Sequence, residues 1–243
     1  MLVCFARTAI LAVTLLTGIG GAVADDLADF NAAVESTAAH NRVAMGYLRT
    51  GNADLASLEI DRMREAWRNL TERFAGKRPA AFDGNPLYSK LWTVGSARLV
   101  AADLMLNSGR PEQAVQSLAG LRGDLYELRK ASHVVVLADC VRDANAIMDA
   151  LMVYNDRTLE WTKPETGAGI ATTASSYGST LARCDGIAGE PVHASAEFRR
   201  LVDGTKASLT LIPGAIAARN GDLMHRILIE LRSFDNLLAF RFG

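Results

Sequence analysis

Residues 47–67 read YLRTGNADLASLEIDRMREAW, in which a short polar turn, Gly-Asn-Ala-Asp, separates two runs typical of helices. From this turn onward, apolar residues recur at steps of four and three positions, at Ala56, Ile60, Met63, Trp67, Leu70 and Phe74. This spacing follows the period of an α-helix, so these side chains share one face and charged residues occupy the other. The stretch therefore predicts an antiparallel helical hairpin with Trp67 in its core.

The same helical period recurs along the chain, while the alternating pattern of strands is nearly absent. The sequence predicts an all-α fold of about eight helices, near residues 26–49, 54–75, 86–108, 111–130, 133–155, 168–187, 194–219 and 222–241. Pro213 falls inside the seventh helix and is expected to kink it or split it near Leu211, because proline cannot donate a backbone hydrogen bond. The strand-like run HVVVLA at 133–138 is interpreted as the buried start of the fifth helix.

The pattern of the first hairpin returns further along the chain at constant offsets. An offset of 58 residues aligns Gly51 with Gly109 and Arg64 with Arg122, and an offset of 168 aligns Arg64 with Arg232. Fixed periods are typical of stacked hairpins. We therefore predict four antiparallel hairpins with a period near 56 to 58 residues, the third being less regular.

Two architectures are compatible with these hairpins, a helical-repeat stack and two tandem four-helix bundles near 26–130 and 133–241. In terms of domains, the expected division is an N-terminal hairpin pair at 25–131 and a C-terminal hairpin pair at 132–243, unless the two pairs form one continuous domain.

The turn regions of the first two hairpins resemble those of tetratricopeptide repeats. The matching residues are Tyr47, Gly51, Ala56, Ile60 and Met63 in the first unit and Met105, Gly109, Ala114, Leu118 and Leu121 in the second. In that family a small residue opens the second helix so that the paired helices pack closely. The period here exceeds the 34 residues of that family, and the Trp-Leu-Gly opening and the closing proline are missing. The resemblance therefore implies antiparallel helical hairpins.

The first residues have the layout of a secretory signal peptide over 1–24. An early positive charge, Arg7, precedes a short apolar run, and Ala22-Val23-Ala24 forms an A-x-A cleavage pattern. We expect a protein exported to the periplasm, or outside the cell if the host lacks an outer membrane. No later stretch is apolar for long enough to predict a membrane span. The net charge of −1 gives no reason to expect nucleic acid as a partner.

Cys140 and Cys184 are the two cysteines left after processing, and an even count in an exported chain predicts a disulfide. If the fifth and sixth helices form a hairpin centred near residue 162, the two positions are equidistant from its turn. The alternative is a copper site in which these sulfurs act with Met148 and Met152 on one helical face, because soft ligands suit Cu(I).

No C-x-x-C-H motif is present, which excludes covalent haem in its usual form. Non-covalent haem would require an axial histidine or methionine directed into a bundle. The candidates are His40, Met45, Met224 and His225, each of which has a core or surface role as its alternative. No cofactor is predicted, with copper and haem kept as alternatives.

Motifs of zinc, di-iron, phosphate-loop and serine-hydrolase enzymes are also missing, so no enzyme is predicted. In the connector 156–169, Trp161 is flanked by Glu160 and Lys163. This aromatic residue either contacts a partner or folds back on the bundle.

Near the C-terminus, Asp235 takes the apolar position that Trp67 and Leu125 hold in the earlier hairpins. Because an unpaired buried charge is costly, Arg232 is its expected partner. The pair either fastens the last helix or lines a ligand groove.

Taken together, these features predict a non-enzymatic binding or scaffolding module whose partner is another protein or peptide in the periplasm. The alternative is a helical bundle that carries a metal or haem for electron transfer or metal handling.

Overall fold

The computed structural model describes residues 20–156 and 158–243. Most of the expected signal peptide, residues 1–19, lies outside this description, so the signal peptide stays a prediction. Within the described ranges the chain is all-α, with eight helices of seven residues or more and no strand. This confirms the predicted fold class. None of the helices described is both long and apolar enough to cross a membrane.

Four helices form the first half of the structure, with a short 3-10 helix between the second and third. They are α1 (Gly20–Arg49), α2 (Ala53–Phe74), η1 (Ala80–Phe82), α3 (Pro86–Asn107) and α4 (Pro111–Ala131). The second half consists of α5 (Leu137–Met152), α6 (Pro164–Ile187), α7 (Glu190–His193), α8 (Ala196–Leu209), α9 (Ile212–Ala217) and α10 (Gly221–Phe242). The chain leaves the helix between α8 and α9 at residues 210–211, where Pro213 predicted a split.

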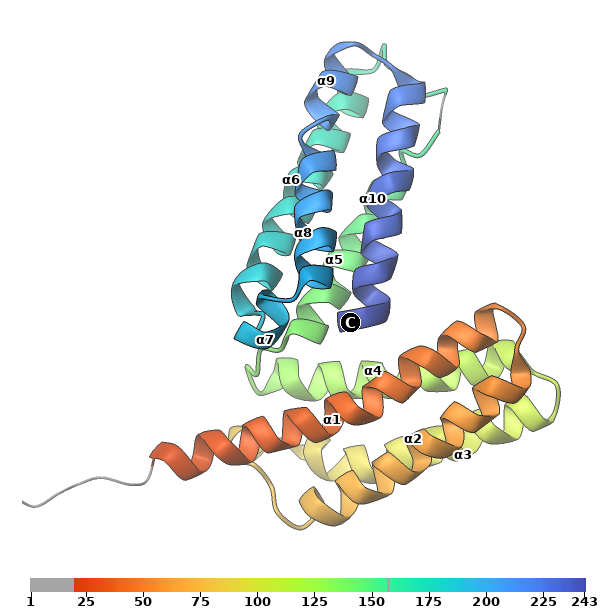
Figure 1. Cartoon of the computed structure of the whole chain (residues 1–243), viewed down its shortest axis with the longest axis vertical. Coiled ribbons are helices and arrows are strands. Elements are labelled where there is room, and N and C mark those ends of the chain that lie inside the picture. The colour runs from red at the N-terminus through yellow and green to blue at the C-terminus, as the bar shows by residue number, and fades with distance from the viewer. Residues whose placement is uncertain (1–19, 157) are drawn as a thin grey trace, which may run out of the picture.

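The helices pack as two four-helix bundles in tandem (Figure 1). One hydrophobic core contains buried residues from Phe30 to Leu128, and the other two core clusters draw their buried residues from Cys140 to Leu238. No buried residue belongs to a core shared by both halves of the described chain. Of the two architectures left open, the structure therefore has tandem bundles. In Figure 1 the second bundle stands crosswise on the side of the first that carries α1 and α4.

Three hairpin turns have the same geometry at the predicted offsets. Gly51 and Gly109 have φ of 74° and 71°, and Arg219, at the offset of 168, has φ of 50°. In each turn the next amide donates to a carbonyl in the last turn of the preceding helix: Asn52 N to Tyr47 O, Arg110 N to Met105 O and Asn220 N to Ala215 O, at 2.9, 2.8 and 3.0 Å. This is the pattern of a Schellman motif. The offsets therefore relate structurally equivalent positions.

The prediction for residues 133–138 is wrong. His133 has φ of 56°, Val136 is extended, and α5 begins only at Leu137. Val135 is 70% exposed instead of buried. A left-handed turn closes α4 through a hydrogen bond from the Val134 amide to the Arg129 carbonyl, at 2.9 Å. Val136 then has the extended backbone that suits a β-branched residue. This segment links the two bundles.

Candidate functional site

The two bundles meet where the last turns of α10 approach α1. Arg42 Nη1 of α1 donates to the Gly243 carbonyl oxygen at 3.0 Å. The Phe240 ring of α10 lies directly against Gly46 of α1, since a Cβ added there would be 3.4 Å from Phe240 Cε2, an ordinary van der Waals contact. These contacts hold one end of the second bundle against the C-terminal part of α1.

Polar contacts also fasten α4 to α5 across the linker. The Arg129 guanidinium donates two hydrogen bonds of 2.6 Å to the Asp139 carboxylate, and both side chains are largely buried. Nearby, Tyr126 donates to Asp143 at 2.9 Å, and the Arg142 guanidinium lies 4.1 Å from the centre of the Tyr126 ring. Four helices from both bundles, α1, α4, α5 and α10, therefore surround the junction.

A cavity of about 430 Å³, here called the basic hollow, lies at this junction. Its walls include five arginines, namely Arg42, Arg49, Arg122, Arg142 and Arg232. Asp149 is the one acidic residue in its lining. Its volume falls in the range of pockets that bind small molecules.

Two of these arginines have carboxylate partners. Arg42 Nη2 lies 2.5 Å from Glu35 Oε1. Arg232 Nη2 lies 2.5 Å from Asp149 Oδ1, and its Nη1 lies 3.3 Å from Asp235 Oδ2.

The other three, Arg49, Arg122 and Arg142, form no hydrogen bond or ion pair with a carboxylate in the described part of the chain. The hollow is therefore lined by three guanidinium groups that no carboxylate of the described residues contacts directly.

Arg122 occupies the least favourable position of the three. It is half-buried on α4. Burial lowers the pKa of its guanidinium, the positive charges of Arg42, Arg142 and Arg49 lower it further, and the charge of Asp139 opposes this with a smaller effect. Such a shift means that the charged form is destabilised by its surroundings. An anion in the hollow would reverse this, because guanidinium groups bind carboxylate and phosphate oxygens through paired, charge-assisted hydrogen bonds.

A second cavity of about 260 Å³, here called the apolar hollow, adjoins the basic hollow and shares Arg122 and Arg142 with it. Its apolar wall includes Val34, Ala38, Leu125, Val136, Leu137 and Phe242. Its charged residues include Glu35, Arg129 and Asp139, which have partners of their own. The two hollows therefore present a cationic region beside an apolar one.

The expected pair of Arg232 and Asp235 is present, and its members face different surroundings. Asp235 is 1% exposed and accepts hydrogen bonds from Asn145 at 2.5 Å and Tyr177 at 3.2 Å. Burial raises the pKa of Asp235, and the Asn145 hydrogen bond and the Arg232 charge partly oppose this. Arg232 lines the basic hollow, whereas Asp235 lies in the core. The pair therefore links the core of the second bundle to the basic hollow.

Cys140 and Cys184 form the predicted disulfide between α5 and α6, with their Cα atoms 5.4 Å apart. Their sulfur atoms are bonded to each other, so neither is a free thiolate for the copper site considered with Met148 and Met152. Met148 is buried in the core on the same helix. In the part of the chain described, no group of three or more His, Cys, Asp or Glu side chains is arranged to hold a metal ion.

The four residues considered for haem lie in different bundles. His40 and Met45 are on α1, where His40 Nδ1 is 2.7 Å from Glu59 Oε2 and Met45 lines the basic hollow. Met224 and His225 are on α10, and Met224 is fully buried in the second core. The structure therefore does not bring the two pairs together.

Trp161 is half-buried and packs against the core of the second bundle. Glu160 and Lys163, which flank it, contact each other. This arrangement favours the alternative in which the aromatic residue folds back on the bundle. Its role in partner binding stays a prediction.

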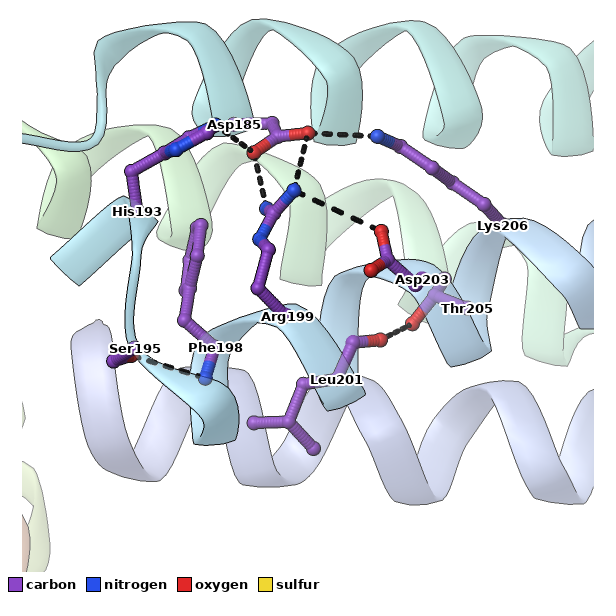
Figure 2. Close-up of polar contacts among 9 residues, drawn as sticks. All are labelled: Asp185, His193, Ser195, Phe198, Arg199, Leu201, Asp203, Thr205 and Lys206. Atoms are coloured by element: carbon purple, nitrogen blue, oxygen red, sulfur yellow. Dashed lines mark hydrogen bonds and ion pairs between the residues drawn. The ribbon is translucent and has the colours of Figure 1, made fainter. Parts of the chain in front are cut away.

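A separate polar cluster surrounds Asp185 of α6 (Figure 2). Arg199 and Lys206 of α8 donate to its carboxylate, Lys206 at 2.7 Å, and His193 Nε2 lies 3.4 Å away. Burial raises the pKa of Asp185, but the hydrogen bonds from Lys206 and Arg199 outweigh it and bring the pKa below its ordinary value. Because Arg199 and Lys206 already contact this carboxylate, the cluster fastens α8 to α6, and the contact of His193 adds α7.

In the sequence, Arg122 stands out only as a repeated position, whereas Arg232 is also the expected partner of Asp235, with a ligand groove as one alternative for the pair. The sequence pattern did not single out Arg42, Arg49 or Arg142. One signal was available: Arg42, Met45 and Arg49 are spaced by three and four residues, which places them on one face of a helix. Comparison with protein-family models, with curated proteins and with solved structures finds no significant match to this chain. The site is therefore interpreted from its own geometry, which is that of a two-bundle helical protein with a basic interbundle cleft.

Proposed function

We propose that this protein is an exported, non-enzymatic binding module and that the basic hollow binds an anionic ligand. The observation that carries the proposal is the group of three arginines without carboxylate partners, contributed by α1, α4 and α5. The signal-peptide pattern supports export, and the Cys140–Cys184 disulfide is of the kind that persists in an oxidising compartment. The predicted partner, a protein or peptide in the periplasm, would have to present acidic groups.

An internal comparison strengthens this interpretation. Arg64, Arg122 and Arg232 occupy equivalent positions in three hairpins. Arg64 lies 3.3 Å from Asp103 and Arg232 lies 2.5 Å from Asp149, whereas Arg122 has no carboxylate at ion-pair distance among the described residues. The arginine that faces the hollow from α4 therefore lacks the partner that its equivalents have.

The test is an equilibrium titration of the mature protein with a small polyanion, inorganic pyrophosphate, in which calorimetry measures the binding. Replacing Arg122 with glutamine should weaken binding by roughly 10-fold to 100-fold, the range for a hydrogen bond to a charged group. Arg110→Gln removes the same charge from an exposed position, the N-cap of α4, and should leave the affinity within about twofold. Binding should also weaken with added salt, because screening reduces charge attraction.

Two results would contradict the proposal. If the wild-type protein bound neither pyrophosphate nor an acidic peptide in this titration, the basic hollow would not be an anion-binding site. Equal losses of affinity in Arg122→Gln and Arg110→Gln would attribute binding to net charge instead of to the hollow.

A further inference from the structure

We infer that the ligand is an amphipathic anion, with a phosphate or carboxylate head in the basic hollow and an apolar chain in the apolar hollow. This inference rests on the proposed function and specifies its ligand class. It is carried by the arrangement of the two hollows, which adjoin at Arg122 and Arg142 and differ in the chemistry of their walls.

The head group is defined by the arginines that remain available. Arg49, Arg122 and Arg142 come from three different helices, so an anion among them would be contacted from several sides. The Arg142 guanidinium also lies over the face of the Tyr126 ring, 4.1 Å from its centre, and this contact helps to orient it. Planar guanidinium groups pair with two oxygens of a phosphate or a carboxylate, and both heads satisfy this geometry.

The apolar chain of the ligand is inferred from the walls of the apolar hollow. Val34 and Ala38 contribute one turn of α1, and Leu125 contributes the facing position of α4. Leu137 and Phe242 belong to the second bundle. An apolar group here would contact both bundles, and its transfer from water would be favourable in proportion to the area buried.

Simpler ligands fit the two hollows less well than an amphipathic anion does. A small inorganic anion would occupy the basic hollow and leave the apolar one hydrated. An uncharged apolar molecule would leave the three arginines without counter-charges. A molecule that carries both parts satisfies both sets of walls at once.

The experiment compares inorganic phosphate, octyl phosphate and octanol as ligands of the mature wild-type protein, with a series of alkyl phosphates of increasing chain length. Each methylene that enters the apolar hollow should raise the affinity about fourfold, until the hollow is filled. Octanol should bind much more weakly than octyl phosphate. Sodium octanoate in place of octyl phosphate tells whether the head is read as a phosphate or as a carboxylate.

Two variants on α1 test whether the apolar chain of the ligand lies in the apolar hollow. Ala38→Trp should fill the apolar hollow and reduce the affinity for octyl phosphate to that for inorganic phosphate, leaving the latter unchanged. Ala32→Trp adds the same side chain at an exposed position of α1 and should leave both affinities unchanged. The helical circular dichroism and melting temperature of each variant are recorded beforehand. Should Ala38→Trp fail to fold, the chain-length series on the wild type decides the question alone.

The outcomes separate this inference from the function on which it rests. Equal affinity for inorganic phosphate and octyl phosphate, both lost in Arg122→Gln, would overturn the amphipathic ligand and keep the anion site. Equal affinity for octanol and octyl phosphate would overturn the head group and with it the anion site. No binding of any phosphate or octanoate would overturn both proposals.

Discussion

The packing of Trp67 against Gly95 allows a sharp test of the first bundle. Trp67 of α2 is 3% exposed, and its indole Nε1 donates to Ser96 Oγ of α3 at 3.1 Å. A Cβ at Gly95 would lie 2.1 Å from Trp67 Cζ2 and 2.6 Å from Cη2. These are ring atoms of a rigid side chain that also packs against Trp92, with ring centroids 5.8 Å apart. Gly95→Ala therefore forces the indole or α3 to move by more than an ångström.

The magnitude follows from two opposing effects. Replacing a glycine inside a helix with alanine stabilises it by about 0.5 to 1 kcal/mol. Overpacking a close contact costs about 1 to 3 kcal/mol, and loss of the Ser96 hydrogen bond adds about 1 kcal/mol. Gly95→Ala should therefore lower the free energy of unfolding by about 1 to 3 kcal/mol.

The control is Gly123→Ala in α4, where an added Cβ would meet nothing within 4 Å. This variant should be more stable than the wild type by about 0.5 to 1 kcal/mol. Urea unfolding followed by circular dichroism measures both. Equal stability of the two variants would refute the packing described for Trp67. As a further check, Gly95→Ala should cost at least about 1 kcal/mol less in a protein that already carries Trp67→Leu, because the two sites are in contact.

Three further predictions concern stability. Arg219 has φ of 50°, so Arg219→Gly should raise the free energy of unfolding by about 0.5 to 1 kcal/mol in urea unfolding, whereas Arg219→Ala should not. Asp185→Asn should lower it by about 1 to 2 kcal/mol at pH 7, because Arg199 and Lys206 lose a charged partner. The pKa of Asp185 is lowered in the folded protein, so its stabilising effect is present above the unfolded pKa near 4 and disappears as the pH falls through the folded pKa. The difference in the free energy of unfolding between Asp185→Asn and wild type should therefore shrink at pH 3. The same difference at pH 7 and pH 3 would contradict this. Trp161→Ala should cost about 1 to 3 kcal/mol, between the values for surface and fully buried residues, and a thermal melt identical to that of wild type would indicate that Trp161 does not pack on the core.

Features that depend on local periodicity could be predicted from the sequence. The spacing of Trp67 predicts its place in the core, and the symmetry of Cys140 and Cys184 about one turn predicts the disulfide; the structure has both. Pro213 marked the break between α8 and α9 because proline acts on its own helix. In each case the deciding interaction lies within one helix or one hairpin.

Other features depend on how separate elements meet, and periodicity does not contain this information. Residues 134–136 are apolar enough for a buried helix, yet they link two bundles, and Val135 is exposed. The connector of Trp161 has no period from which its packing could be read. The basic hollow was missed for the same reason, because its arginines come from four helices of two bundles and the net charge of the chain is only −1.

The near-neutral composition gives the hollow its significance. With 26 basic and 27 acidic residues, the chain has carboxylates available for its arginines, and Arg64, Arg98, Arg129 and Arg199 each pair with one. Against that background, three arginines face one cavity without such a partner, and one of them is half-buried among like charges. Folding alone does not require this arrangement, since like charges held together oppose the compact state. A bound anion would remove the repulsion, so the ligand should also stabilise the junction of the two bundles and raise the melting temperature with concentration.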